Sequence, residues 1–211
     1  MIIRWPGGKS GQDRKELVST LDLFPTFCEI AGVEAPRSLV GCSLKAIVEG
    51  KSPKWRDYLF TEYHLHSNHN PWPQRTVRDV RYKLIYNPLA GQVNPGYAFT
   101  MGKKFFQAPE DELLAVASKE VKEAYQLMKK PPRYELYDLQ TDPFEFRNLA
   151  DDPVHAKTRD RLIRKLEDWQ EETGDALKDP AAARRLFGLI MDAGTGKRKA
   201  LDYSFMRKET K

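Results

Sequence analysis

The sequence of 211 residues contains 40% hydrophobic and 31% charged residues, which is enough apolar surface for one medium-sized domain, or for one domain and part of another. No apolar run approaches the roughly 20 residues of a membrane-spanning helix, and the first residues lack the basic region and long apolar core of a signal peptide. The formal net charge of +5 is concentrated in the last fifteen residues, where six Lys and Arg oppose two acidic residues. A solvated basic tail is the favoured interpretation over a nucleic-acid contact.

The first fifty residues contain one candidate strand and two candidate helices. Met1–Trp5 has the short apolar run of a buried strand, which needs partner strands, and no other segment of the first fifty residues supplies one. A helix is expected to begin at the capping residue Asp22 and to end at Gly32. Its apolar face carries Leu23, Phe27, Cys28, Ile30 and Ala31. A second, short helix is expected at Ser43–Glu49. An unpaired Met1–Trp5 would leave an apolar edge, so we expect the isolated chain to be poorly soluble.

The remainder of the chain mixes strands and helices. Period-two patterns predict strands at Trp55–Tyr63, Arg75–Arg78, Tyr82–Tyr86 and Tyr134–Leu139. Helical spacing of apolar residues predicts helices at residues 110–129, Val154–Thr173 and Ala181–Asp192. The tail after Gly194 is predicted to be disordered. This order indicates an α+β unit, with a few antiparallel strands covered by at least one long helix.

Neither cysteine belongs to a recognisable metal or redox motif. Cys28 and Cys42 form no C-x-x-C pair and have no histidine at metal-ligand spacing. Cys28 suits a core position, and the sequence leaves a disulfide between the two open. The pair Asp151-Asp152 is interpreted as a turn or helix cap rather than a metal site, and His155 as a structural residue.

Six short motifs follow one another between residues 2 and 150. They are Ile2–Gly7 (an apolar pair before Trp-Pro-Gly), Ser19–Thr26 (S-x-x-D-L-x-P-T), Gly41–Leu44 (G-x-S-L), Trp55–Glu62, Arg81–Ile85 (R-x-x-K-L-I) and Glu135–Ala150 (E-L-Y-D-L-x-x-D-P-x-E-x-x-N-L). In this order they resemble the sulfatase family. The stretch Tyr134–Pro153, followed by a helix that contains Trp169, looks most like the heparan N-sulfatases.

The resemblance implies a fold with an α/β and an α+β part. Residues 1–50 would be the tail end of an alkaline-phosphatase-like α/β catalytic domain. Residues 51–178 would form the sulfatase C-terminal subdomain, a small antiparallel sheet packed on helices. Residues 179–211 would add a weak helix and the basic tail.

Sulfatases of this family cleave sulfate esters or sulfamates with a formylglycine, made from the Cys of a C-x-P-S-R-type motif, and with Ca²⁺ held by Asp and Asn residues. Cys28 and Cys42 lack the Pro and Arg in register, and the family's metal motifs precede the segment that Ile2 resembles. The resemblance therefore implies no catalytic residue and no metal ligand in this chain, with Ca²⁺ and formylglycine expected in the complete enzyme. Complete family members are usually exported, periplasmic or lysosomal, which leaves the compartment of this chain open.

The candidate substrate-binding residues lie in and beside the loop Tyr63–Arg78. They are His64, His66, Arg75 and Arg78. Sulfated sugars are anions, which suit an arginine fork and histidine donors, and the resemblance places this loop near the mouth of the pocket. The alternative is a polar surface loop in which Arg75 or Arg78 pairs with Asp79 or Glu62.

Three functions remain open from the sequence. The first is a C-terminal fragment of a sulfatase for glycosaminoglycan-type sugars, inactive alone, whose partner is a sulfated carbohydrate once an N-terminal half completes it. The second is a non-catalytic sulfated-glycan-binding or regulatory module. The third, nucleic-acid binding through the basic tail, finds no matching motif in the rest of the sequence, and no membrane partner is expected.

Overall fold

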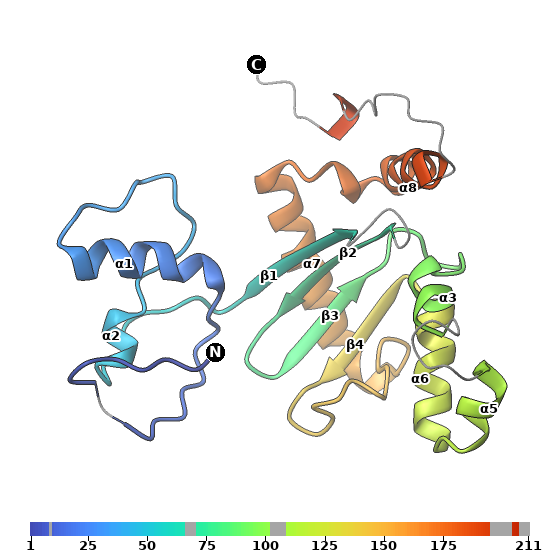
Figure 1. Ribbon diagram of the computed structural model, residues 1–211, viewed down its shortest axis with the longest axis horizontal. Coiled ribbons are helices and arrows are strands. Elements are labelled where there is room, and N and C mark those ends of the chain that lie inside the picture. The colour runs from blue at the N-terminus through green and yellow to red at the C-terminus, as the bar shows by residue number, and fades with distance from the viewer. Residues whose placement is uncertain (9, 66–70, 102–108, 195–203, 207–211) are drawn as a thin grey trace. The chain divides into compact units, whose positions relative to one another are not determined.

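The computed structural model describes residues 1–8, 10–65, 71–101, 109–194 and 204–206. The chain divides into two compact units, Met1–Leu59 and Phe60–Lys211, whose elements are shown in Figure 1. The boundary falls inside the strand that the sequence predicts at Trp55–Tyr63. The three-part division into residues 1–50, 51–178 and 179–211 stays a prediction.

The first unit contains a 3-10 turn and two helices, which are η1 (Thr20–Asp22), α1 (Leu23–Ala31) and α2 (Lys45–Val48). Ser19 and Asp22 form a capping box, in which the Asp22 carboxylate accepts the Ser19 N–H at 2.7 Å. Gly32 ends α1 in the left-handed region at φ 69°, where glycine has no steric cost. The predicted helix is confirmed, with the expected residues at its two ends.

In the first unit, the strand expected at Met1–Trp5 is not formed, and Cys28 does not lie in a core. Met1–Trp5 lies outside the four-stranded sheet of the described chain, because a strand exists only through hydrogen bonds to a neighbour. The apolar face of α1 is not buried within its unit, since Phe27 and Ile30 are more than half exposed. Cys28, expected in a core, is only half-buried, and both cysteines are free thiols.

The second unit is built on one sheet with the strand order β1-β2-β3-β4. Its strands are β1 (Leu59–Leu65), β2 (Pro71–Arg78), β3 (Tyr82–Tyr86) and β4 (Tyr134–Asp138). The pairs β2–β3 and β3–β4 are antiparallel, and their register places Val77 opposite Leu84 and Leu84 opposite Leu136. These three side chains are fully buried on one face of the sheet. The predicted antiparallel sheet is confirmed.

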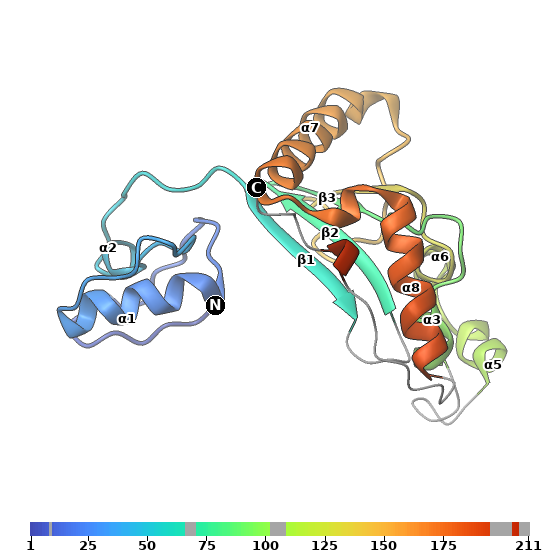
Figure 2. The same cartoon turned by 90° about the horizontal axis from the view of Figure 1, so that it is seen from above.

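The long helix α7 (Ala156–Thr173) covers this face of the sheet, as Figure 2 shows. Leu162 and Leu166 are buried, and Trp169 stacks on Phe60 of β1 with ring centroids 5.3 Å apart. Gly174 ends the helix at φ 65°. The helix predicted at Val154–Thr173 is therefore confirmed, except that its first residues form the 3-10 turn η2 (Pro153–His155).

The other helices of the second unit are α3 (Pro95–Met101), α5 (Glu110–Ala115), α6 (Lys119–Lys129), η3 (Ala176–Lys178), α8 (Pro180–Gly194) and the turn η4 (Ser204–Met206). The single helix predicted at residues 110–129 is wrong, because Ser118 caps a new helix by accepting the Val121 N–H. The helix predicted at Ala181–Asp192 is confirmed as α8, which packs on Trp72 and Leu89 through Leu186.

No helix in the described ranges combines the length and the apolarity that a bilayer crossing requires. Most of the tail that the sequence predicts to be disordered, residues 195–203 and 207–211, lies outside the described residues.

Candidate functional site

In the first unit, three of the sequence motifs meet at the fully buried carboxylate of Asp22. It accepts the backbone N–H of Ser19 at 2.7 Å and that of Cys42 at 2.9 Å. Arg56 donates to both carboxylate oxygens, at 2.8 and 2.5 Å. Burial alone would raise the pKa of Asp22, but the bonds from Arg56, Cys42 and Ser19 outweigh it and hold the pKa below its ordinary value.

The chain around Gly41 closes this network. Thr26 Oγ1 donates to the Asp22 carbonyl and accepts the Leu44 N–H at 2.8 Å. A Cβ on Gly41 would lie 2.1 Å from the Leu21 carbonyl oxygen, which is an overlap that only glycine avoids. The motifs S-x-x-D-L-x-P-T and G-x-S-L thus form one hydrogen-bond network around Asp22. The Arg56 side chain of the third motif completes this network.

The motifs of the second unit form a comparable network of ion pairs and hydrogen bonds at β3 and β4. Arg81 binds the buried carboxylate of Asp138 in a bidentate pair, with Nη2 2.7 Å from Oδ2. Lys83 binds both oxygens of Glu145 at 2.9 and 2.8 Å. Glu145 has φ 60° and is the one non-glycine residue with positive φ in the described chain. The backbone of Glu145 is therefore strained. In this conformation its carboxylate binds Lys83.

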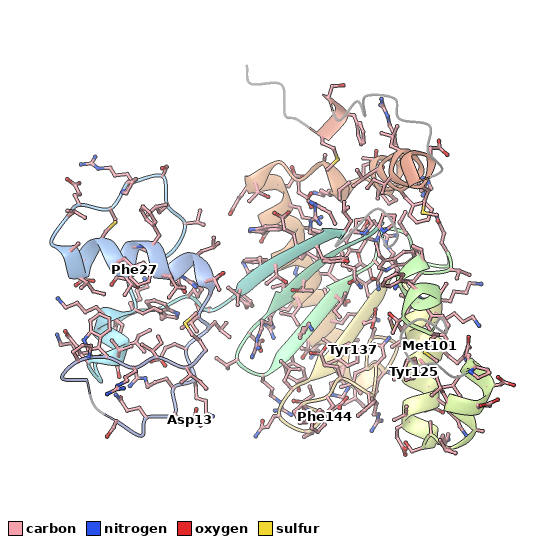
Figure 3. All side chains as sticks on the ribbon, viewed as in Figure 1. Asp13, Phe27, Met101, Tyr125, Tyr137 and Phe144 are labelled. Atoms are coloured by element: carbon pink, nitrogen blue, oxygen red, sulfur yellow. The ribbon has the colours of Figure 1, made fainter. Side chains whose placement is uncertain are left out.

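Asn148 and Glu135 complete the network at β3 and β4. The Asn148 Oδ1 accepts the N–H of Leu136 at 2.9 Å, so this side chain extends the pairing of β4 at the edge of the sheet. Glu135 is buried and accepts bonds from Asn87 Nδ2 and the Tyr137 hydroxyl, and burial raises its pKa. Figure 3 labels Tyr137 on β4. The longest motif of the sequence is therefore a structural motif of this sheet.

A third cluster lies at the candidate substrate-binding residues and is centred on Arg75. The Arg75 side chain is only 1% exposed. Nε and Nη2 bind Asp175 at 2.8 and 2.7 Å, and Nη1 donates to the carbonyls of Tyr63 and Gln74. The remaining N–H of Nη2 points to His64 Nε2 at 2.9 Å. All five donors of the guanidinium therefore have acceptors.

The contact with Arg75 fixes the protonation of His64. An arginine only donates, so Nε2 of His64 must accept, and the ring is neutral with its proton on Nδ1. Burial, followed by the charge of Arg75, lowers the pKa of His64, while Glu62 acts in the opposite direction. Glu62 also lies 3.5 Å from Arg75, which is the pairing that the surface-loop alternative anticipates.

The structure brings His64 and Arg75 together and leaves Arg78 apart from them. Side chains alternate along a strand, so Arg78 lies on the opposite face of β2 from Arg75. Arg78 is half-buried, and its Nε donates to the Asp79 carbonyl at 3.3 Å. His66 lies outside the described residues.

Asp175 holds this cluster together and belongs to none of the sequence motifs. It accepts Arg75, the Gln170 amide at 2.8 Å and the Leu177 N–H at 3.1 Å. Burial would raise the pKa of Asp175, but Arg75 and Gln170 hold it below its ordinary value. The one local signal is that an Asp after Gly174 is a good cap for η3. Its pairing with a residue 100 positions away has no signal in a single sequence.

The described residues contain no group of three or more His, Cys, Asp and Glu side chains that could hold a metal ion. Asp152 accepts the Val154 N–H at 2.9 Å and caps η2, which confirms the helix-cap interpretation of that residue.

Comparison with known proteins finds sulfatases over most of the chain. The family profile described as "N-sulphoglucosamine sulphohydrolase, C-terminal" matches residues 1–93. An "Ulvan-active sulfatase" of Formosa agariphila is 31% identical over 193 residues, covering 84% of this chain and 34% of the relative. Human "N-sulphoglucosamine sulphohydrolase" is 29% identical over 179 residues, covering 78% of this chain and 34% of the human protein.

Solved structures give the same result for the fold. A "2-O GAG sulfatase" superposes with a TM-score of 0.57 at 26% identity, covering 82% of this chain and 29% of that chain. A phosphonate monoester hydrolase from Silicibacter pomeroyi shares the fold with a TM-score of 0.51 at 23% identity, over 80% of this chain and 28% of that one. The chain thus spans about a third of the length of the curated relatives it matches.

Proposed function

Because this chain belongs to the sulfatases and corresponds to their C-terminal part, we propose that it forms the C-terminal subdomain of an enzyme that removes sulfate groups from sugars. We propose further that the chain alone does not hydrolyse them. The observation that carries this proposal is the role of the shared motifs. Asp22, Asp138 and Glu145 are all engaged in contacts that hold the fold together.

The formylglycine and Ca²⁺ of the family do not fit the groups present here. Cys28 lies within α1 and precedes Glu-Ile-Ala, and Cys42 precedes Ser-Leu-Lys, so neither has the sequence from which formylglycine is made. The buried carboxylate of Asp22 already accepts two backbone N–H groups and a guanidinium, which leaves it unsuited to a cation. No step of sulfate hydrolysis is assigned to these residues.

The names of the relatives support a sulfated polysaccharide as the substrate class. They include a "Delta 4,5-hexuronate-2-O-sulfatase" and an "N-acetylglucosamine-6-O-sulfatase" of Bacteroides thetaiotaomicron, besides the ulvan-active and N-sulphoglucosamine enzymes. These names differ in the position of the sulfate and agree on a sulfated sugar. We therefore propose a glycosaminoglycan-type sugar and leave the sulfate position unassigned.

For contact with the sugar we propose His64, His66 and Arg78 of the segment Tyr63–Arg78. His64 lies near the end of β1 and Arg78 ends β2, whereas His66 falls outside the described residues. The five occupied donors of Arg75 support a positioning role for it, because a sulfate oxygen would have to displace an existing acceptor. Arg75 then acts on the sugar through the orientation of His64.

The first experiment measures sulfate release by the purified chain. N-sulfoglucosamine, a 2-O-sulfated uronate and 4-nitrophenyl sulfate are incubated with the chain, and free sulfate is measured by ion chromatography. We expect no release above buffer. Turnover that scales with the amount of chain and co-elutes with it in gel filtration would refute the proposal of an inactive subdomain.

The second experiment tests the positive part of the proposal with a chimera. This chain replaces the matching C-terminal part of the Formosa relative, and sulfate release from ulvan is compared with that of the intact relative. We expect the chimera to retain activity. In the chimera, His64→Ala should raise KM severalfold with kcat less affected, whereas Arg147→Ala, at an exposed arginine of another loop, should leave both unchanged. Equal kinetics for the two variants would remove His64 from the proposed substrate site.

A further inference from the structure

The turn η4 is the last element in the described ranges, and it packs on an apolar cluster of the second unit. The buried members of this cluster, which we call the Trp72 cluster, are Trp72, Leu89, Leu177, Ala183, Leu186 and Ile190. Phe205 and Met206 of η4 pack against the Trp72 cluster and are half-buried. In both ribbon views η4 lies beside α8 (Figures 1 and 2).

A cation and a second element also hold η4 in place. The guanidinium carbon of Arg185 on α8 lies 4.3 Å from the centre of the Phe205 ring, which is a cation–π contact. The turn η4 also contacts η3. Apolar burial and the contact with Arg185 therefore fix η4 on both α8 and η3.

The turn η3 connects the Trp72 cluster with Arg75. Leu177 of η3 is fully buried in the cluster, and its N–H donates to Asp175 Oδ1 at 3.1 Å. Asp175 binds Arg75, whose Nη2 lies 2.9 Å from His64 Nε2. Because side chains alternate along a strand, Trp72 and Arg75 lie on opposite faces of β2. A displacement of η3 is therefore transmitted from one face of the sheet to His64 on the other.

Trp72 is buried at a cost in free energy. Its side chain belongs to a residue that is 3% exposed, and Nε1–H has no acceptor among the described residues. A buried donor without a partner destabilises the packed arrangement, whereas the apolar contacts of Phe205 and Met206 stabilise it. Because these contributions oppose each other, the packing of η4 depends on few side chains, and one substitution in η4 is enough to release it.

We propose that η4 is a positioning element for His64. Docked on the Trp72 cluster, η4 holds η3 in place, and η3 holds the pair of Asp175 and Arg75 that orients His64. Phe205 is the positioning residue of η4, because it makes both the apolar contact and the contact with Arg185. The inference rests on the proposed function for the role of His64 at the sugar, whereas the link from η4 to His64 is a property of this chain alone.

The pKa of His64 reports on this link. Burial and the charge of Arg75 lower the pKa of His64, and Glu62 and Asp175 act in the opposite direction. Release of η4 lets η3 move, so that His64 becomes more exposed and its contact with Arg75 loosens. The pKa of His64 should then rise toward its ordinary value.

The test is an NMR titration of the imidazole Cε1 protons in the full chain, with His64→Gln to assign the signal. Phe205→Ser should raise the pKa of His64, and Phe205→Leu, which retains an apolar contact, should restore the lower value. The matched control is Phe144→Ser, at a phenylalanine that is 78% exposed, and it should leave the pKa unchanged. Circular dichroism checks that each variant is folded. If Phe205→Ser does not fold, Met206→Ser removes the second apolar contact and provides the same test.

Equal pKa values of His64 in the η4 variant and in Phe144→Ser would overturn the inference, and so would an equal rise in Phe205→Leu and Phe205→Ser. KM is measured separately in the chimera, where Phe205→Ser should raise it severalfold with kcat less affected. A higher pKa with an unchanged KM would support the positioning of His64 and contradict its proposed contact with the sugar. A higher KM with an unchanged pKa would overturn the inference and leave the proposed function standing.

Discussion

Removal of the Asp175 carboxylate should destabilise the second unit more than any other single truncation of a charged side chain that we predict. Asp175 links Arg75 of β2 to Gln170 of α7 and to the start of η3. In Asp175→Ala, the Arg75 guanidinium stays buried and loses both of its bonds to a carboxylate. Glu62, which is 56% exposed and 3.5 Å away, compensates for only a part of this loss.

The magnitude follows from two contributions. Breaking one partner of a buried, hydrogen-bonded ion pair costs about 3–5 kcal/mol, and loss of the cap on η3 adds about 1 kcal/mol. The free energy of unfolding should therefore fall by about 4–6 kcal/mol, which is comparable with the whole stability of a marginal domain. The melting temperature should fall by roughly 10–20 °C.

The assay is urea unfolding followed by circular dichroism, with thermal melts as a second measurement. The matched control is Asp160→Ala, which removes a half-exposed carboxylate that pairs with Arg159 on α7 and should cost less than about 1 kcal/mol. The double variant Arg75→Met with Asp175→Leu removes both charges and should recover much of the lost stability. If Asp175→Ala melts within about 2 °C of the unchanged chain, the buried pair does not stabilise the fold as argued.

Three further outcomes follow from the other clusters. Because the pKa of His64 is lowered on folding, its contribution to stability is complete above the unfolded pKa of about 6.5 and is lost as the pH falls toward the folded value; His64→Gln should flatten the decrease in urea midpoint between pH 7.5 and 5.5, and an unchanged slope would contradict the neutral tautomer. Asp22→Asn should lower the free energy of unfolding of the first unit by about 2–4 kcal/mol, because Arg56 loses its counter-charge, and a midpoint equal to that of the unchanged chain would contradict this. Glu145→Gly should be more stable than Glu145→Ala by about 1 kcal/mol in urea unfolding, because both lose the bond to Lys83 and only glycine accepts φ 60° without strain; the reverse order would show that the strain is absent.

Apolar spacing and terminating residues correctly predicted the helices that depend on nearby residues alone. The spacing of Leu162, Leu166 and Trp169 and the terminator Gly174 are sufficient to place α7, because they fix one apolar face and one end. The same reasoning failed at residues 110–129, where the apolar spacing continues through the break and only the capping residue Ser118 marks a new helix. The strand prediction at Met1–Trp5 is wrong for another reason. A strand forms only beside a neighbouring strand, and the residues of Met1–Trp5 encode only the tendency to pair.

The candidate site shows more clearly what cannot be predicted from a single sequence. His64 and Arg75 could be singled out because a sulfated sugar needs cationic and donor groups, and they do lie in contact. The sequence could not show that Arg75 is buried, because its burial depends on Asp175, which is 100 residues away and comes from another element. Residue type gives the chemistry that a side chain can perform, and the pairing across the fold decides whether that chemistry is free for a ligand.

Pairing across the fold also explains why several residues of the shared motifs stabilise the fold. Asp22 binds three chain segments, and Glu145 occupies a strained backbone position to reach Lys83. Each of these positions tolerates few replacements, because a buried carboxylate without its donors, or a β-carbon at Gly41, is costly wherever the fold is retained. The free energy of folding alone is enough to restrict these residues, so their presence indicates the fold. Activity has to be established by measuring sulfate release, because the residues that identify the fold do not contact the reacting sulfate in the proposed arrangement.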